Sequence, residues 1–471
     1  MRTLGILLAV LLPSIGLAAP RVVSVHDARA TNWDYATGSY YESRFVDQAI
    51  VDAMFLKGMQ LLTGKSTTKE AWQALLPHWA AGQKIAIKVN FNNGGNANTL
   101  DSTPQPIHSL VASLLDFGFQ LSQIRVFDAS RPIANWFRTQ VGYPALPIFD
   151  CNPISCTWNY SSNDRALFSS SDPGASVTFA TYTGSHKITD VLIGSDYLVN
   201  ACIFQRHGGA VVSLALKNHF GTIDGLYTGG HTIHDWMVPW GAHYGGTTNN
   251  PIVDINLNSN IRNKTVLVLG DGLYGDWPDN NGVPHRWVSF GNDSPNSLFF
   301  GVDPVATDSV MIDRLEWEGS FGYWGPQATD LYVDAENRGL GVHEVCGFSK
   351  SCSRIDFASY DFDSGTQTGT PVPEPTATPG PTSTANPGST STPTPAAKKG
   401  SGCSASGFGE LSWLVCLGLG WGWLRRNKFF SVLRPCPSCA AGIPPRAGCP
   451  ADVGCRRPRS RERSTKERRR R

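Results

Sequence analysis

Three adjacent side chains in the segment 213–225, SLALKNHFGTIDG, carry chemical groups typical of active sites: Lys217, Asn218 and His219. They directly follow the apolar run Val211–Leu216, which predicts a strand in the interior of a sheet. A lysine flanked by apolar residues in such a strand requires a partner or a ligand, because an unpaired buried charge is costly. An ammonium, an amide and an imidazole together can bind an anion and transfer a proton.

Polar side chains also follow other predicted strands, and ligands of open α/β sheets bind beyond the carboxyl ends of the strands. We therefore predict one polar crevice in which cationic groups hold an anion and a histidine, oriented by an aspartate, transfers a proton. The predicted catalytic residues are His207, Lys217, Asn218, His219 and Asp271, and the predicted ligand-binding residues are Lys88, Asn90 and Arg206. Asp128 and Ser130 follow a further strand and receive no role. The alternative is that each of these residues only ends a strand or caps a helix.

A transition metal is a second use for the histidines. His231 and His234 lie three residues apart in GGHTIHDWMVPW and would share one face of a helix. With His219 they form the predicted metal set, to which His207 or Asp271 could add a ligand. A divalent transition metal is the cofactor that such a set would hold. Otherwise these histidines act as proton donors, as anion-binding groups or in the structure alone.

The cysteines predict disulfides in an oxidising compartment. Cys151 and Cys156 form one close pair and Cys346 and Cys352 another, and each pair would close a short loop. Cys202 lies alone in an apolar run and is predicted to be a buried thiol. Because no run of closely spaced cysteines of the ferredoxin kind is present, no iron–sulfur cluster is expected.

Apolar runs and helical patterns alternate along residues 19–369. The runs that predict strands are 21–25, 84–90, 124–128, 176–182, 197–204, 211–216 and 265–269. The patterns that predict helices are 41–62, 68–79, a helix from Thr103-Pro104 to Gly118, and another from Asp303-Pro304 to Gly319. This order predicts an α/β fold with a mainly parallel sheet flanked by helices, and a long loop excursion over residues 131–175.

The segment 196–225, DYLVNACIFQRHGGAVVSLALKNHFGTIDG, resembles the core motif of the domain-of-unknown-function 362 (DUF362) family. The stretches IAIKVN (85–90), LVLGDGLYG (267–275) and GVDPVATDSV (301–310) are similar to other blocks of that family, although Val89 replaces its usual proline. The resemblance implies an α/β domain and no particular reaction. The site that it implies consists of Lys88, His207, Lys217, Asn218, His219 and Asp271.

Both ends of the chain predict export and anchoring. Residues 1–18 have the pattern of a secretory signal peptide, and residues 370–399 are a Pro/Thr/Ser-rich linker predicted to be disordered. Residues 400–428 resemble a MYXO-CTERM sorting signal, with Cys403 as the anchoring residue and a transmembrane segment at about 408–424. This resemblance implies anchoring at the membrane or cell surface and a sorting protease or modifying enzyme as partner. The basic tail, 429–471, is predicted to be disordered.

Charge and motifs limit the class of function. Residues 19–370 contain 22 Lys and Arg against 33 Asp and Glu, which argues against nucleic acid as a partner. No Gly-x-Ser-x-Gly turn is present, which weakens a lipase-like reading. The leading hypothesis is an exported, surface-anchored enzyme or ligand-binding protein that takes a small anionic molecule. The alternative is a non-catalytic surface module that binds carbohydrate or cell-wall polymer through exposed tryptophans.

Overall fold

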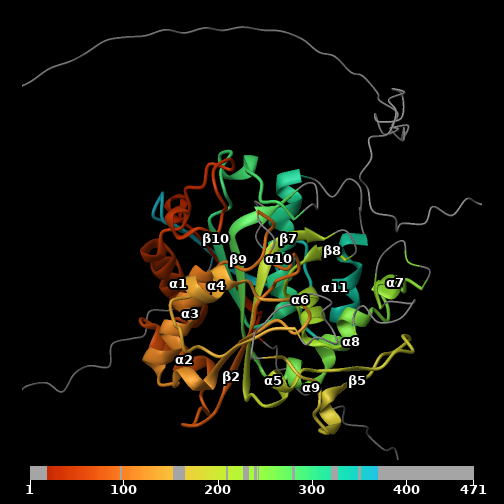
Figure 1. Cartoon of the computed structure of the whole chain (residues 1–471). Helices are drawn as coiled ribbons and strands as arrows, with labels where there is room; N and C mark the ends of the chain where they lie inside the picture. Colours follow the sequence, from red (N-terminus) through yellow and green to blue (C-terminus); the bar gives the residue numbers. More distant parts are fainter. Residues whose placement is uncertain are drawn as a thin grey trace, which may run out of the picture. The chain divides into compact units, whose positions relative to one another are not determined.

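A large central sheet with helices on both sides forms the folded part of the chain (Figure 1). The computed structural model describes residues 18–95, 98–151, 165–207, 210–225, 233–237, 241, 243–277, 282–319, 327–347 and 352–369. The predicted α/β class is therefore confirmed at the level of a mixed α/β fold.

The strands of the sheet follow the order β12-β11-β1-β10-β9-β7-β2-β3-β4, with β8 paired to β7. Their bounds are β1 Arg21–His26, β2 Ile85–Lys88, β3 Ile124–Phe127, β4 Ile148–Phe149, β7 Tyr197–His207, β8 Val211–Ser213, β9 Thr265–Asp276, β10 Ser297–Gly301, β11 Asp356–Asp361 and β12 Thr366–Thr368. A separate pair consists of β5 Ser176–Val177 and β6 His186–Lys187.

The helices alternate with these strands as the sequence predicts. Their bounds are α1 Gln48–Thr63, α2 Thr68–Leu75, α3 Pro104–Phe117, α4 Asn135–Gln140, α5 Asp190–Ile193, α6 Ala215–Asn218, α7 His234–Met237, α8 Pro251–Leu257, α9 Ser259–Arg262, α10 Pro304–Gly319 and α11 Gln327–Asn337. Short 3-10 helices are η1 Ala28–Ala30, η2 Ser43–Phe45, η3 Leu121–Gln123, η4 Pro173–Ala175, η5 His219–Thr222 and η6 Val288–Phe290.

The sheet is mixed, and the prediction of a mainly parallel sheet holds for its centre and for the β1–β11 pair but not throughout. The strands β9, β7, β2, β3 and β4 are parallel neighbours. In contrast, β10 is antiparallel to both β9 and β1, and β8 folds back antiparallel on β7. The connection from β7 to β8 spans only three residues, which suits an antiparallel return, whereas parallel neighbours need a crossover.

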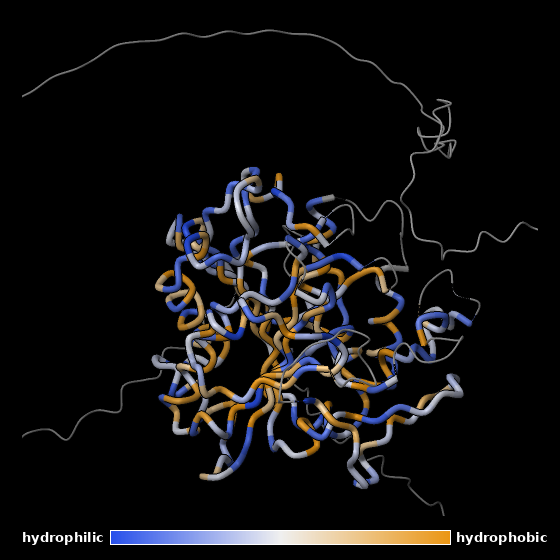
Figure 2. The backbone as a smooth tube through the Cα atoms, viewed as in Figure 1, coloured by the Kyte–Doolittle hydropathy of each residue, from blue (hydrophilic) through white to orange (hydrophobic). Residues whose placement is uncertain are grey.

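Two apolar cores cover the two faces of the sheet. Side chains of β7 alternate between them: Leu198 and Cys202 face one core, and Val199 and Ile203 face the other. Helices α1 to α4 pack on the second face, and α5 to α11 pack on the first (Figure 1). The hydrophobic backbone segments accordingly gather where the strands run together (Figure 2). The central strands are thus buried on both faces, as near-continuous apolar runs predict.

Local capping signals fix two of the predicted helices. α3 begins at Pro104 and ends before Gly118, whose φ of 134° few other residues tolerate. α10 begins at Pro304, where the Asp303 carboxylate accepts hydrogen bonds from the first backbone amides. α1, predicted from residue 41, begins only at Gln48, because Asp47 caps it there.

The predicted strand 211–216 is wrong beyond Ser213. β8 ends at that residue and the short helix α6 begins at Ala215, so Lys217 lies on a helix. The predicted strand 176–182 also shortens to β5, because its partner β6 is only two residues long. The predicted loop excursion 131–175 includes α4 and β4, and residues 152–164 are not described.

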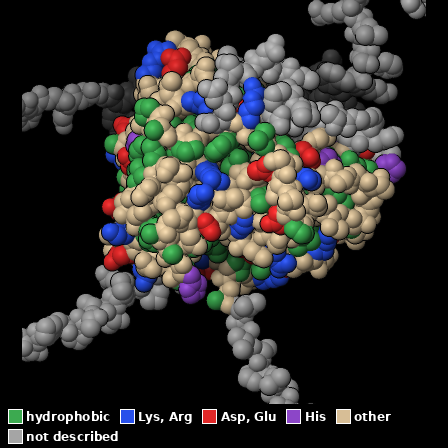
Figure 3. Space-filling view, turned by 60° about the horizontal axis from the view of Figure 1, so that its bottom comes forward, with side chains coloured by type: hydrophobic (Ala, Val, Ile, Leu, Met, Phe, Trp, Pro, Cys, Tyr) green, Lys and Arg blue, Asp and Glu red, His purple; other side chains and the backbone are tan. Residues whose placement is uncertain are grey.

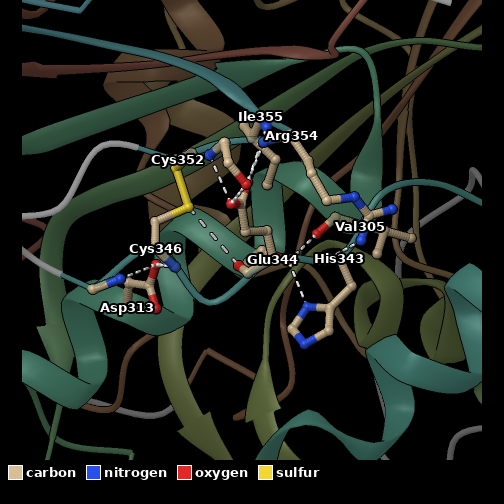
Figure 4. Close-up of a disulfide and its surroundings, with 11 residues drawn as sticks. Val305, Asp313, His343, Glu344, Cys346, Cys352, Arg354 and Ile355 are labelled. Atoms are coloured by element: carbon tan, nitrogen blue, oxygen red, sulfur yellow. Dashed lines mark hydrogen bonds between the residues drawn. A yellow bond between two sulfur atoms is a disulfide. The ribbon is translucent and has the colours of Figure 1, made fainter.

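One of the two predicted disulfides is present among the described residues. Cys346 and Cys352 are joined with an S–S distance of 2.02 Å (Figure 4). Beside it, Glu344 accepts hydrogen bonds from the backbone amides of Ser353 and Arg354. Cys202 is a buried free thiol, as predicted. The Cys151–Cys156 pair stays a prediction, because Cys156 lies outside the described residues.

The predicted terminal segments lie almost wholly outside the described residues. The signal peptide, the linker, the sorting segment with Cys403, and the basic tail therefore stay predictions. Within the described part of the chain, no helix combines the length and apolar character needed to span a membrane. On the face drawn in Figure 3, acidic and basic side chains are interspersed among uncharged ones.

Candidate functional site

The helix α6 carries Lys217, and three buried polar side chains hold its backbone in place. Asp308 of α10 accepts hydrogen bonds from the amides of Ala215 (2.7 Å) and Leu216 (3.0 Å). Asn200 of β7 donates to the Ala215 carbonyl (2.8 Å), and Asn256 of α8 donates to the Leu216 carbonyl (2.9 Å). Because all three partners are themselves buried in the core, the position of α6 is closely constrained.

Lys217 is the unusual group of the site. The residue is 6% exposed, and its Nζ lies 3.9 Å from the centre of the Phe220 ring. Among the described residues, its Nζ has no hydrogen-bond or ion-pair partner. Burial, followed by the positive charges of Arg131 and Lys88, lowers the pKa of Lys217 to about 7. Lys217 can therefore exchange a proton near neutral pH.

Lys88, at the end of β2, is fully engaged by the protein. Its Nζ donates to the Val89 carbonyl (2.5 Å), to Asn218 Oδ1 (3.0 Å) and to Asp128 Oδ2 (3.2 Å). Burial lowers the pKa of Lys88, and the Asp128 carboxylate opposes this effect. Since an ammonium has three N–H donors, Lys88 contributes positive charge to the site and keeps no donor for a ligand.

Asn218 links the strands beneath the site. Its Oδ1 accepts hydrogen bonds from Lys88 and from Asn90 Nδ2 (3.2 Å). Its Nδ2 donates to Asn200 Oδ1 (2.7 Å) and to the Ala201 carbonyl (3.2 Å). The amide therefore joins β2, β7 and α6 into one buried polar network, and its role here is to position the lysines.

Gly221 allows the backbone to approach the Lys88–Asp128 ion pair closely. A Cβ atom at this position would lie 2.7 Å from Lys88 Nζ and 2.8 Å from Asp128 Oδ1. The Gly221 carbonyl also accepts a hydrogen bond from the Ala129 amide (2.8 Å). Asp128 in turn accepts from the amides of Ser130 and Phe91, so the loops after β2 and β3 are held at the same point.

These side chains surround one small cavity of about 30 Å³, here called the Lys217 cavity. Its lining residues are Lys88, Asn90, Asn92, Asp128, Ser130, Arg131, Ser213, Lys217, Asn218, Phe220, Gly221 and His234. The interior residues are buried, whereas Asn92, Arg131 and His234 are half-buried and form the rim. Three cationic side chains line the cavity against the single carboxylate of Asp128, and this balance favours an anionic ligand.

Two further groups add to the chemistry of the Lys217 cavity. Ser213 Oγ accepts a hydrogen bond from Asn90 (3.4 Å), and its hydroxyl proton has no acceptor among the described residues. Burial, with the charges of Lys217 and Arg131, lowers the pKa of His234 to about 4. Neutral His234 at the rim can therefore accept or donate a hydrogen bond without adding charge.

Of the residues predicted from the sequence, Lys88, Asn90, Lys217 and Asn218 line the same cavity. His207 lies near it: burial and the charges of Lys217, His234 and Arg131 lower its pKa well below the usual range. Its Nδ1 accepts a hydrogen bond from the Ala210 amide (2.9 Å).

Three other predicted residues lie elsewhere. Asp271 Oδ2 accepts hydrogen bonds from the Thr103 amide (2.8 Å) and hydroxyl (2.7 Å), at the start of α3, and burial raises its pKa to about 6. Arg206 places its guanidinium carbon 5.3 Å from the centre of the Trp277 ring. His219 lines a different cavity. Neither Asp271 nor Arg206 lines the Lys217 cavity.

The structure does not assemble the predicted metal set from described residues. His231 lies outside them, and His219 and His234 line different cavities. Among the described residues, two groups of side chains lie close enough together to hold a metal, and neither contains these histidines. One of the two groups is Glu344 with Cys346 and Cys352, whose sulfur atoms form the disulfide (Figure 4).

Several residues of the site have no predicted role from the sequence. Two of them could have been found from the sequence. Asp128 directly follows the apolar strand β3, and Asn200 is a polar residue within an apolar run. Arg131 could not, because it begins a stretch interpreted as irregular. Asp308, 91 residues after Lys217, could not be connected to it without the fold.

Comparison with known proteins agrees with the family suggested by the sequence. Residues 85–313 match the family model described as Domain of unknown function (DUF362). No curated protein matches the chain. The matched segment contains every residue that lines the Lys217 cavity. The match supports the DUF362 family for residues 85–313.

Proposed function

We propose that this protein is an enzyme that binds a small anionic molecule in the Lys217 cavity and exchanges a proton with it through Lys217. One observation carries the proposal: a lysine side chain is 6% exposed and has no hydrogen-bond or ion-pair partner among the described residues. A buried amine of this kind is costly to a fold, and a bound anion removes the cost by pairing with its charge.

The surroundings support a division of roles. Lys88 is held by three acceptors and supplies a fixed positive charge behind the ligand. Arg131 and His234 at the rim would contact the outer part of the ligand. Lys217, with a pKa of about 7, can be the base when neutral and the acid when charged. The ligand's reacting end must be small, because the cavity is about 30 Å³.

Acetate and inorganic phosphate serve as probes in titration calorimetry of the full chain at pH 6.5. The proposal predicts that Lys217→Met abolishes binding of both anions, whereas Lys69→Met, a change at an exposed lysine of α2, leaves it unchanged. Equal binding by wild type and Lys217→Met, or no binding of either anion to wild type, would overturn it.

The alternative, a carbohydrate-binding module, has no equally specific support. Several described tryptophans are buried: Trp33, Trp72, Trp277 and Trp287. Trp317 of α10, at 55%, is the exposed tryptophan among the described residues, and one exposed ring does not form a binding face. Export and anchoring at the cell surface remain part of the proposal and rest on the sequence patterns of residues 1–18 and 400–428 alone.

A further inference from the structure

A second cavity lies behind the network that holds Lys217. It measures about 230 Å³ and is here called the His219 cavity. Its lining residues are Asn200, His219, Asn256, Ile261, Arg262, Thr265, Val302, Asp303, Pro304 and Leu340. Asn200 separates it from the Lys217 cavity, since its Oδ1 accepts the Asn218 hydrogen bond.

His219 has one ring nitrogen that the protein does not use. The residue is 1% exposed, and its Nδ1 is paired with the Thr222 hydroxyl at 3.0 Å. Among the described residues, its Nε2 has no partner. A buried ring nitrogen normally has a hydrogen-bond partner, so an open one beside a cavity indicates a ligand or an ordered water.

Asn256 contributes a second open polar atom, and its orientation is settled by its neighbours. Its Nδ2 donates to the carbonyls of Leu216 (2.9 Å) and Ile252 (2.8 Å), which fixes Oδ1 as the remaining atom. Among the described residues no donor reaches Oδ1, although the residue is only 2% exposed. A ligand that donates a hydrogen bond would satisfy it.

The rest of the lining limits the class of ligand. Ile261, Pro304 and Leu340 supply apolar surface, and Val302, 44% exposed, lies where the cavity meets the outside. An apolar protein cavity of about 150 Å³ can hold benzene, so a single substituted ring fits a cavity of this size. Arg262 is exposed and its Nη2 donates to the Gly339 carbonyl (2.6 Å), so its charge faces away from the interior.

We propose that the His219 cavity is a second ligand site, which binds a small aromatic molecule carrying a hydroxyl or N–H group, such as a phenol or an indole. The ring packs on Ile261, Pro304 and Leu340. The ligand donates to Asn256 Oδ1, and the oxygen of a phenol also accepts a hydrogen bond from His219 Nε2. This site is separate from the anion site and does not depend on Lys217.

Phenol, indole and toluene serve as probes in titration calorimetry with the full chain. Phenol and indole are expected to bind, and toluene, which has the same ring size without a donor, is expected to bind about five-fold more weakly or not at all. His219→Phe keeps a ring and loses the nitrogen, and it should weaken phenol binding by a similar factor.

Two tryptophan variants locate the site. Val302→Trp places a large ring at the mouth and should abolish phenol binding, whereas Val288→Trp, at a position 77% exposed and outside the lining, should leave it unchanged. Both positions are exposed, so the fold is not at risk. Failure of phenol and indole to bind, phenol binding that survives Val302→Trp, or equal affinity for toluene and phenol would overturn the proposal.

Discussion

Replacing Lys217 by methionine should stabilise the protein, and by an amount that depends on pH. The pKa of Lys217 falls from 10.5 to about 7 on folding, first because of burial. Between these values the unfolded chain carries a proton that the folded protein lacks, so the lysine's unfavourable contribution shrinks as pH rises from about 7 to 10.5. Below pH 7 both states are protonated and the full cost applies, roughly 4–5 kcal/mol.

Methionine removes this cost and keeps an unbranched side chain against Phe220. The free energy of unfolding of Lys217→Met should therefore exceed that of wild type at pH 6 by up to roughly 4 kcal/mol. The difference between the two unfolding free energies should shrink by about 2–3 kcal/mol between pH 6 and pH 9, because folded wild type loses the Lys217 proton over this range. The interactions of Lys217 with the charges of Lys88, Arg131 and Asp128 are included in its pKa shift, and Lys217→Met removes them together with the cost of burial.

Urea unfolding of the full chain at pH 6 and pH 9, followed by circular dichroism, measures both free energies. The exposed-lysine variant Lys69→Met is the matched control and should track wild type at both pH values. A difference between wild type and Lys217→Met that stays constant from pH 6 to pH 9 would refute the reasoning, because it would show that Lys217 does not change protonation on folding in this range.

Three further predictions follow from packing and hydrogen bonding. Gly221→Ala brings a Cβ to 2.7 Å from Lys88 Nζ. It should lower the free energy of unfolding by about 1–3 kcal/mol and weaken acetate binding. Unchanged values for both would contradict the close approach of the Gly221 backbone to Lys88. Asp308→Ala leaves two buried amides of α6 without an acceptor. It should lower the free energy of unfolding in urea by about 2–4 kcal/mol and abolish acetate binding. A folded variant that binds acetate like wild type would show that Asp308 does not position Lys217. Removing the disulfide with Cys346→Ser and Cys352→Ser should cost about 2 kcal/mol and leave acetate binding intact; lost binding would link this loop to the site.

The helices with local end signals were predictable from the sequence. α3 and α10 begin at the prolines that predicted them, because proline is suited to a first helical turn whatever the tertiary context. The boundary between β8 and α6 was not predictable, because the carboxylate that caps α6 is Asp308, far along the chain. The run Val211–Leu216 is apolar in either conformation, so hydrophobicity alone cannot separate strand from helix there.

The candidate site was predictable only in part. Lys88 ends β2, inside a strand that the sequence predicts, whereas Lys217 lies on α6 and not at the end of a strand. Both nevertheless line one cavity. Asp271 was expected to follow a strand, but β9 continues past it, because β10 pairs with β9 up to Gly272 and β7 pairs with it again at Asp276. Inside a strand, a side chain's direction depends on register, and that depends on partners the sequence does not name.

Proton uptake on acetate binding tests the central claim most directly. Calorimetric titration of the full chain with acetate at pH 8, in two buffers of different ionisation enthalpy, measures the protons taken up per acetate bound. Free Lys217 is mostly neutral at pH 8, and an anion beside it raises its pKa, so the account predicts uptake approaching about one proton, and almost none at pH 5.5. Binding of acetate without proton uptake at pH 8, or with the same uptake in Lys217→Met, would contradict it.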